Sequence, residues 1–122
     1  MALEKHPAVY IMANRYRRTL YVGVTSALYN RVCDHKNESF DGFTKTWGIK
    51  THVWSEHHLS MAEAIERETL VKKWHRPWKF RVIEGMNPNW RDLHDHIDAV
   101  ETLFDMQIEK QRQQVIFMRH GH

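Results

Sequence analysis

The sequence contains a single cysteine, Cys33, so it cannot form an internal disulfide bond, which fits a reducing compartment. It has no apolar run long enough to cross a bilayer and no signal-peptide pattern at its start, where Glu4 to Pro7 interrupt any apolar stretch. We therefore expect a soluble, cytoplasmic protein without membrane contact. At 122 residues the chain can bury one core but cannot hold a second catalytic unit.

Several motifs with known chemistry are also missing. Among the 10 histidines no pair has the spacing of HExxH or of a zinc finger, and CxxC ligands are absent, so a structural zinc site is not predicted. The sequence has no phosphate-binding glycine loop and no G-x-S-x-G elbow. Nucleotide-driven and serine-hydrolase activities therefore lack support.

The net charge of +3 is small but unevenly distributed. Residues 1–91 contain 15 Lys and Arg against 9 Asp and Glu, which gives +6, whereas residues 92–122 contain 3 against 6, which gives −3. A basic body favours a polyanionic partner, although many soluble domains are equally basic and bind no nucleic acid.

Residues 8–25 predict two short strands joined by a basic, polar turn, because β-branched and aromatic residues cluster on either side of residues 14–19. With the turn near Tyr16, Tyr10 and Tyr21 are expected roughly opposite each other. Gly23 would let another backbone or a phosphate approach closely. The two phenols would then share a small area, unless both simply anchor the core of the sheet.

The segments that follow predict alternating helices and strands. Thr25 or Ser26 can cap a helix to about residue 37, in which Arg31 and His35 share a face away from the apolar stripe. These two side chains are either solvated or directed at the same pocket as the tyrosines. A loop over residues 38–48, with one cation at Lys45, and a strand over about residues 49–56 come next.

A second helix is expected over residues 61–74, opened by a capping box at Ser60 and Glu63. Its apolar arc consists of Met61, Ala64, Ile65 and Val71, and Glu68 falls in the middle of that arc. A carboxylate on the core side needs a compensating cation, so Glu68 either pairs with Lys72 or binds a metal ion.

Residues 72–81 interleave cations with large aromatic side chains, and Pro77 can occupy the first turn of a further short helix. Such a segment can bind a phosphate backbone by charge and bases by stacking, or its tryptophans can simply pack inward. After a turn at residues 87–90, the apolar pattern predicts a long amphipathic helix from about residue 92 to 118.

These features together resemble the small stand-alone members of the GIY-YIG nuclease superfamily over about residues 9–93. Ala8-Val9-Tyr10 and Tyr21-Val22-Gly23 stand in place of the two name-giving triplets, and both tyrosines and the second glycine are kept. The other matching positions are Thr25, Arg31, His35, Gly42-Phe43-Thr44-Lys45, Glu68 and Asn87-Pro88-x-Trp90-Arg91-Asp92-Leu93.

The expected fold is α/β (α+β), a small, mainly antiparallel three-stranded sheet flanked by helices, with a C-terminal amphipathic helix. Residues 1–93 would form the nuclease domain, and residues 94–122 a helical extension that packs on the domain or on a partner. The resemblance implies a DNA endonuclease that hydrolyses phosphodiester bonds with one Mg²⁺ or Mn²⁺ ion.

The candidate catalytic residues are Tyr10, Tyr21, Arg31, His35, Glu68 and Asn87. Glu68 is the expected metal ligand and Arg31 the phosphate clamp, because a carboxylate suits a hard ion and a guanidinium stays charged. Tyr10 is favoured as the base and Tyr21 as the residue that positions water or phosphate, with the reverse order open. His35 would assist proton transfer or bind phosphate, and Asn87, by resemblance, would hold the metal-side geometry or a phosphate oxygen.

The expected partner is single-stranded, flap or duplex DNA, on which Trp74, Trp78 and Trp90 could stack unpaired bases. The candidate DNA-binding residues are Arg17, Arg18, Lys45, Lys72, Lys73, Trp74, Arg76 and Lys79. A non-catalytic nucleic-acid-binding module is the alternative, and a protein-interaction domain acting through the tail helix is a third hypothesis. The chain would be a monomer, or a homodimer formed through that helix.

Overall fold

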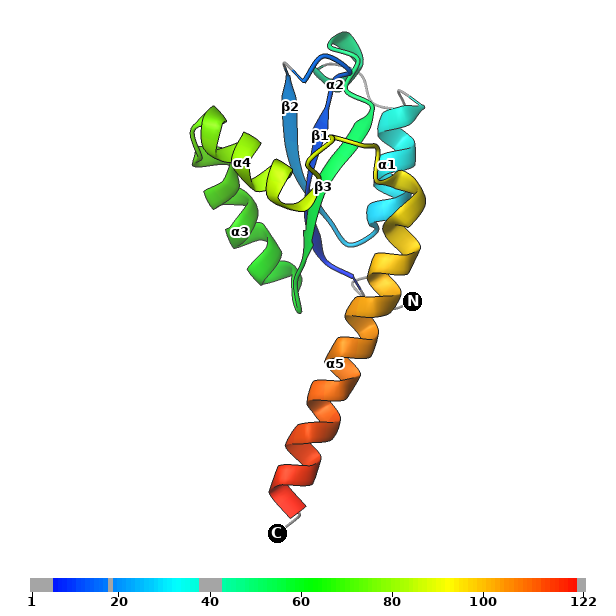
Figure 1. Cartoon of the computed structure of the whole chain (residues 1–122), viewed down its shortest axis with the longest axis vertical. Coiled ribbons are helices and arrows are strands. Elements are labelled where there is room, and N and C mark those ends of the chain that lie inside the picture. The colour runs from blue at the N-terminus through cyan, green and yellow to red at the C-terminus, as the bar shows by residue number, and fades with distance from the viewer. Residues whose placement is uncertain (1–5, 18, 38–42, 121–122) are drawn as a thin grey trace.

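The computed structural model describes residues 6–17, 19–37 and 43–120. Within them the strands are β1 (Ala8–Ala13), β2 (Leu20–Thr25) and β3 (Thr51–His57), and the helices are α1 (Leu28–Lys36), α2 (Phe43–Thr46), α3 (Met61–Lys73), α4 (Arg76–Met86), a 3₁₀ turn η1 (His94–His96) and α5 (Ile97–His120) (Figure 1). The three-stranded antiparallel sheet flanked by helices confirms the predicted fold class.

The strand order is β2-β1-β3, so β1 is the central strand, and all of its residues are buried. In the β1–β2 register Tyr10 pairs with Gly23 and Tyr21 pairs with Met12. The two tyrosines are therefore diagonal neighbours on one face of the sheet, which refines the prediction that they lie roughly opposite each other, because Tyr10 is paired two residues beyond Tyr21. Side chains two apart on a strand keep the same face, so the shared area survives the shift.

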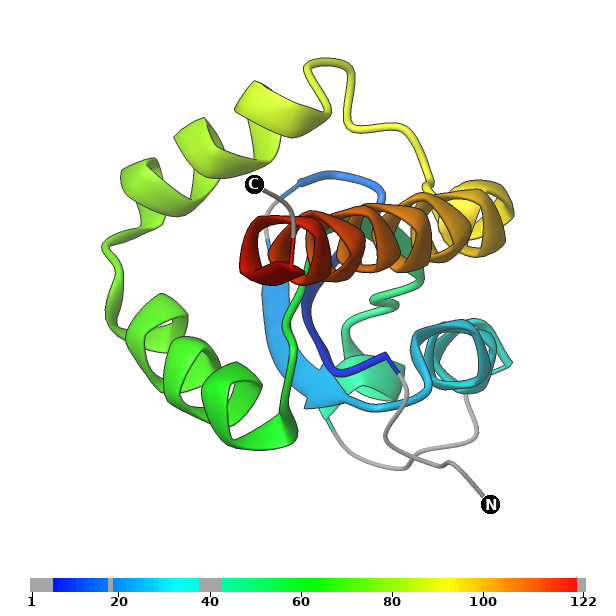
Figure 2. The ribbon, with the colours of Figure 1, turned by 90° about the horizontal axis from the view of Figure 1, so that it is seen from below.

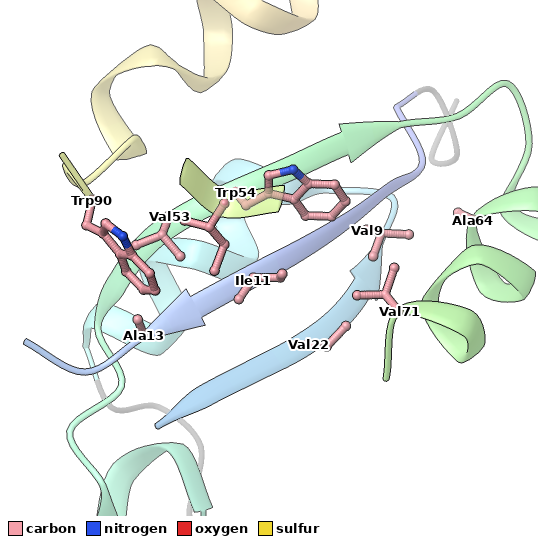
Figure 3. Packing of buried hydrophobic residues seen from close by; sticks show 10 residues of the cluster. Val9, Ile11, Ala13, Val22, Val53, Trp54, Ala64, Val71 and Trp90 are labelled. Atoms are coloured by element: carbon pink, nitrogen blue, oxygen red, sulfur yellow. The ribbon is translucent and has the colours of Figure 1, made fainter. Parts of the chain in front are cut away.

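Helices cover both faces of the sheet, with α3 and α4 on one side and α1 on the other (Figures 1 and 2). On the first face Val9, Ile11 and Ala13 of β1 pack with apolar side chains of β2, β3, α3 and α4 (Figure 3). On the second face the alternate β1 residues, which include Tyr10, pack against Leu28 and Val32 of α1. The period-2 alternation of β1 thus builds two separate cores from one strand.

Of the helix caps predicted before α1 and α3, the structure contains the one at α3. The Ser60 hydroxyl accepts a hydrogen bond from the Glu63 backbone N–H at 3.2 Å, which confirms the predicted cap of α3. The Thr25 hydroxyl accepts one from the Ala27 N–H at 3.0 Å, so it closes a turn before α1 rather than capping the helix itself. Helix α2 lies inside the segment predicted as a loop.

One expectation about the second half of the domain needs correction and another is confirmed. Ile65 is 49 % exposed, so the buried stripe of α3 is narrower than the predicted arc and consists of Ala64 and Val71. The helix predicted with Pro77 in its first turn is present as α4, which has 11 residues, because the missing N–H of Pro breaks no hydrogen bond at that position.

The beginning of α5 packs on the body of the domain. Ile97 is buried, Glu101 accepts a hydrogen bond from the His57 ring at 3.0 Å, and Asp105 lies 3.0 Å from the His6 ring. Figure 1 shows that the second half of α5 then extends beyond the sheet. None of the helices that the structure describes has the length and apolar character needed to span a membrane.

Candidate active site

Tyr10 of β1, Tyr21 of β2 and His35 of α1 form one aromatic cluster. The Tyr10 hydroxyl lies 3.0 Å from Nε2 of His35, and the Tyr21 ring centroid lies 5.0 Å from that of His35 and 6.1 Å from that of Tyr10. Tyr10 and His35 are buried, whereas Tyr21 is partly exposed. Tyr21 is therefore the member of the cluster that solvent can reach.

Gly23 makes room for this cluster. A Cβ atom built on Gly23 would lie 2.6 Å from both the ring carbon Cζ and the hydroxyl of Tyr10, which is closer than side-chain contacts allow. The sequence predicted a close approach at this glycine by another backbone or a phosphate. The group that approaches is instead the phenol of Tyr10. Gly23 is the β2 residue that pairs with Tyr10, and the phenol passes over the backbone at this position.

Burial sets the protonation states of the buried pair. Desolvation, followed by the neighbouring Tyr21 phenol, raises the pKa of Tyr10 above its ordinary value, so Tyr10 is protonated at neutral pH. Desolvation, followed by the Arg31 charge, lowers the pKa of His35, so its imidazole is neutral. A protonated phenol and a neutral imidazole allow Tyr10 to donate its hydrogen bond to Nε2 of His35, in the tautomer that carries its hydrogen on Nδ1.

Arg31 and Glu68 both act electrostatically on the cluster. Arg31, one helical turn before His35 on α1, lowers the pKa of Tyr10, and Glu68 on α3 raises it. Arg31 is exposed, and the Glu68 side chain is 15 % exposed. Tyr10 thus lies within electrostatic reach of a second phenol, an imidazole, a guanidinium and a carboxylate. Together with Tyr10 these groups come from four separate elements, which are β1, β2, α1 and α3.

Glu68 has the ion pair that the sequence offered as an alternative to metal binding. Its Oε2 atom lies 3.1 Å from Nζ of Lys72, four residues later on α3. The Lys72 side chain is 56 % exposed, so this pair lies at the wet edge of the site and not in a closed interior. Because the Glu68 side chain is only 15 % exposed, its carboxylate needs a compensating cation, which a metal ion would supply if Lys72 left.

These residues fit a single hydrated ion held by one carboxylate. Mg²⁺ binds through one or two carboxylates and keeps several of its waters, and Glu68 supplies one carboxylate on a rigid helix. Among the described side chains, no group of three or more His, Cys, Asp or Glu is placed to hold a metal ion, so the site is no closed protein cage.

Asn87, the C-terminal cap of α4, is 5 % exposed and its amide contacts the backbone. Its Nδ2 donates to the carbonyls of Val53 at 3.2 Å and Arg91 at 2.8 Å, and its Oδ1 accepts from the Arg91 N–H at 3.0 Å. These bonds fasten the turn after α4 to β3. This geometry gives Asn87 a positioning role in the turn.

Asp92, a few residues later, connects three elements. Its carboxylate pairs with Lys36 of α1 and accepts hydrogen bonds from the backbone N–H groups of His52 at 3.3 Å and His94 at 3.1 Å. Burial alone would raise the pKa of Asp92, but these hydrogen bonds outweigh it and lower the pKa. Asn87 and Asp92 thereby hold the end of α1 against β3, which fixes the helix that carries Arg31 and His35.

Several predicted DNA-binding residues form a connected basic surface over the β1–β2 turn, α3 and α4. Arg76 donates to the Arg17 carbonyl at 3.3 Å, and Arg17 donates to the Asn89 carbonyl at 3.1 Å. Lys79 donates to the carbonyl of Lys72 at 3.4 Å. Lys73 is exposed on the same helix as Lys72, Lys45 is exposed on α2, and Arg18 lies outside the described residues.

The tryptophans of this region differ in exposure. Trp90 is 6 % exposed and donates to Glu84 at 2.8 Å, so the expectation that it could stack on unpaired bases is wrong. Its ring instead fills the core between α4 and the sheet, edge-to-face with Phe80. Trp74 is partly buried and meets Trp78 edge-to-face, while Trp78 is 49 % exposed beside the basic surface.

Sequence reasoning missed a groove at the hairpin end of the domain, where Tyr16 and Trp47 are exposed. In the sequence analysis Tyr16 only marks the position of the turn between the two strands. Trp47 lies in the segment that was predicted as a loop. The signal available in the sequence was a large aromatic residue in each of two turn-forming segments, where burial is not expected.

A comparison with protein-family models matches residues 6–81 to the GIY-YIG catalytic domain, which is more than half of the chain. The chain belongs to the GIY-YIG family, a class of nucleases that act on DNA and generally use divalent metal ions. Comparison with curated proteins and with solved structures gives no match in either case.

Proposed function

We propose that this chain is a divalent-metal-dependent DNA endonuclease that hydrolyses phosphodiester bonds in single-stranded or branched DNA. The observation that carries the proposal is the convergence of Tyr10, Tyr21 and His35 with the charges of Arg31 and Glu68. A core that serves only for packing does not need two phenols and a buried imidazole near the Glu68 carboxylate and the Arg31 guanidinium.

The two charged residues near the aromatic cluster, Arg31 and Glu68, each have a role that their position supports. Arg31, exposed and permanently charged, binds the scissile phosphate and stabilises the charge that develops on its oxygens. Glu68 would hold one Mg²⁺ or Mn²⁺ ion, which would supply Lewis-acid polarisation of a phosphate oxygen. The ion would take the place that Lys72 has beside the Glu68 carboxylate.

The burial of Tyr10 favours the second of the two orders considered for the tyrosines. Tyr10 is 1 % exposed and its raised pKa keeps it protonated, so it is poorly placed to take a proton from water. Tyr21 is partly exposed and adjoins His35. In the proposed mechanism Tyr21 takes a proton from the attacking water while its own phenolic proton passes to the Tyr10 oxygen. The Tyr10 proton passes in turn to Nε2 of His35, which becomes an imidazolium.

The proposed domain boundary lies near residue 93, with residues 94–122 as an extension. Leu103 and Met106 of α5 are 64 % and 62 % exposed. These exposed apolar side chains support a homodimer formed through this helix.

The substrate is proposed to be unpaired DNA because Trp78 lies exposed beside the basic surface.

Incubation of the protein with single-stranded, flap, branched and duplex DNA in Mg²⁺ or Mn²⁺ tests the proposal. Cleavage of an unpaired or branched substrate that disappears in EDTA and in Glu68→Gln is expected. The non-catalytic binding module predicts salt-dependent binding without scission, unaffected by Glu68→Gln. That second outcome in every DNA geometry would defeat the nuclease proposal.

A further inference from the structure

A groove of about 400 Å³ lies at the hairpin end of the domain. One wall comes from the β1–β2 turn and the other from the end of α2, which Figure 1 shows at the same end of the sheet. The lining residues are Asn14, Arg15, Tyr16, Thr19, Thr46, Trp47 and Gly48. The volume falls within the range of about 300–1,000 Å³ that is usual for small-ligand sites.

Two large aromatic rings line this groove and are partly exposed. Tyr16 is 64 % exposed and Trp47 is 54 % exposed. Exposed aromatic side chains gathered in one concave site mark a binding surface more often than a single scattered apolar residue does. The Arg15 guanidinium lies over the Tyr16 ring, 4.8 Å from its centroid, so one face of this ring already has a cation–π contact.

The polar lining matches the edge of a nucleobase. Asn14, Thr19 and Thr46 bring amide and hydroxyl groups to the groove, and Arg15 is the one charged side chain among the described residues that line it. A site with stacking rings, neutral hydrogen-bonding groups and a single cation suits a base attached to a phosphate backbone. A Cβ atom on Gly48 would meet no atom within 4 Å, so the mouth of the groove is open at that position.

The strand register connects the groove to the proposed active site. Asn14 and Thr19 bond backbone to backbone at 3.2 Å, which continues the β1–β2 pairing beyond its last assigned pair. Thr19 is therefore on the same face of β2 as Tyr21, two residues and about 7 Å away. At about 3.4 Å per nucleotide along a stacked strand, that separation spans about two nucleotides.

We propose that this groove binds an unpaired nucleobase of single-stranded DNA, about two nucleotides from the scissile phosphate. The inference rests on the proposed function for its substrate, but it concerns binding and can be measured without cleavage. Tyr16 and Trp47 stack on the base, and the adjoining polar groups contact its edge. The groove then selects unpaired strands, because a base inside a duplex cannot enter it.

Fluorescence anisotropy in EDTA, where no cleavage occurs, tests the groove on the full-length protein. We compare a short oligothymidylate with an abasic oligonucleotide of equal length, which has the same phosphates but no bases. The wild type is expected to prefer the oligothymidylate. Tyr16→Ala and Trp47→Ala are each expected to weaken its binding by about 5- to 100-fold, in line with the loss of one stacked base. Tyr16→Phe and Trp47→Phe keep an aromatic ring and should retain most of the affinity.

Leu59→Ala is the matched control, since Leu59 is an apolar side chain that is 67 % exposed and lies between β3 and α3, outside the groove. It should retain the preference for bases over abasic sites. Equal binding of both oligonucleotides by the wild type, or undiminished binding by folded Tyr16→Ala and Trp47→Ala, would overturn the groove proposal. Tighter binding of the corresponding oligoribonucleotide by tenfold or more would overturn its assignment to DNA.

Cleavage measured separately distinguishes the two proposals. Base-dependent binding through Tyr16 and Trp47 without cleavage in Mg²⁺ or Mn²⁺ would remove the nuclease proposal and leave the groove. Cleavage that is unchanged in both alanine variants, together with unchanged binding, would leave the nuclease and remove the groove.

Discussion

Substitution of Gly23 by alanine tests the packing that holds the aromatic cluster together. The added Cβ would lie 2.6 Å from the Tyr10 ring and hydroxyl, and Tyr10 is only 1 % exposed, so the ring has little free space to enter. Overpacking a core costs about 1–3 kcal/mol, and loss of the hydrogen bond to His35 about 1 kcal/mol more. Replacing glycine in a strand returns about 0.5–1 kcal/mol of backbone entropy. The free energy of unfolding should therefore fall by roughly 1–3 kcal/mol.

Urea unfolding measures this loss, and single-turnover cleavage below the unfolding temperature measures its effect on the site. A displacement of Tyr10 by about 1 Å is expected to slow cleavage by roughly 100-fold while the protein remains folded. Gly85→Ala is the matched control, because a Cβ at this position of α4 meets no atom within 4 Å. It should leave cleavage unchanged and stabilise the helix by up to about 1 kcal/mol. A Gly23→Ala protein as stable and active as the wild type would refute the account of the cluster.

Three further predictions follow from individual side chains. Burial lowers the pKa of His52 from 6.5 to about 4, so the unfolded chain binds this proton more readily; the free energy of unfolding should fall by roughly 3 kcal/mol from pH 6.5 to 4, and urea unfolding of His52→Gln should show a flatter slope. Lys72→Ala removes the cation paired with Glu68, so half-maximal cleavage should need less Mn²⁺, whereas Lys73→Ala, which removes the same charge without breaking that pair, should not change the requirement. Asn87→Ala leaves backbone groups without partners and should lower the free energy of unfolding by about 1–3 kcal/mol; unchanged urea unfolding would argue against its positioning role.

The parts of the fold that follow local rules were predictable from the sequence. The hairpin and the long α5 have strong periodic patterns, and α3 has a cap at Ser60. The structure contains all three elements. The strand register was predictable only approximately, because a shift of two residues keeps Tyr10 and Tyr21 on the same face. Helix α2 was missed because four residues carry too little periodicity to predict a helix.

The geometry of the site depended on tertiary contacts that no local pattern encodes. The hydrogen bond between Tyr10 and His35 joins residues 25 positions apart, and the steric need for Gly23 arises only once Tyr10 has its rotamer. The two alternatives for Glu68 could not be separated from the helix pattern, since Glu68 pairs with Lys72 and also lies within electrostatic range of Tyr10. The stacking role expected for Trp90 was wrong because an aromatic residue in a predicted turn gives no indication of whether its ring faces the core or the solvent.

The most direct test of the central claim is single-turnover cleavage of single-stranded DNA in Mn²⁺ by Tyr21→Phe and Glu68→Gln, with binding of the same DNA measured in EDTA. If the cluster is the hydrolytic site, each variant should cleave at least about 100-fold more slowly than the wild type and bind the DNA with nearly unchanged affinity. Wild-type cleavage rates in both variants would contradict the account, because the reaction would then not use the phenol and carboxylate assigned to it.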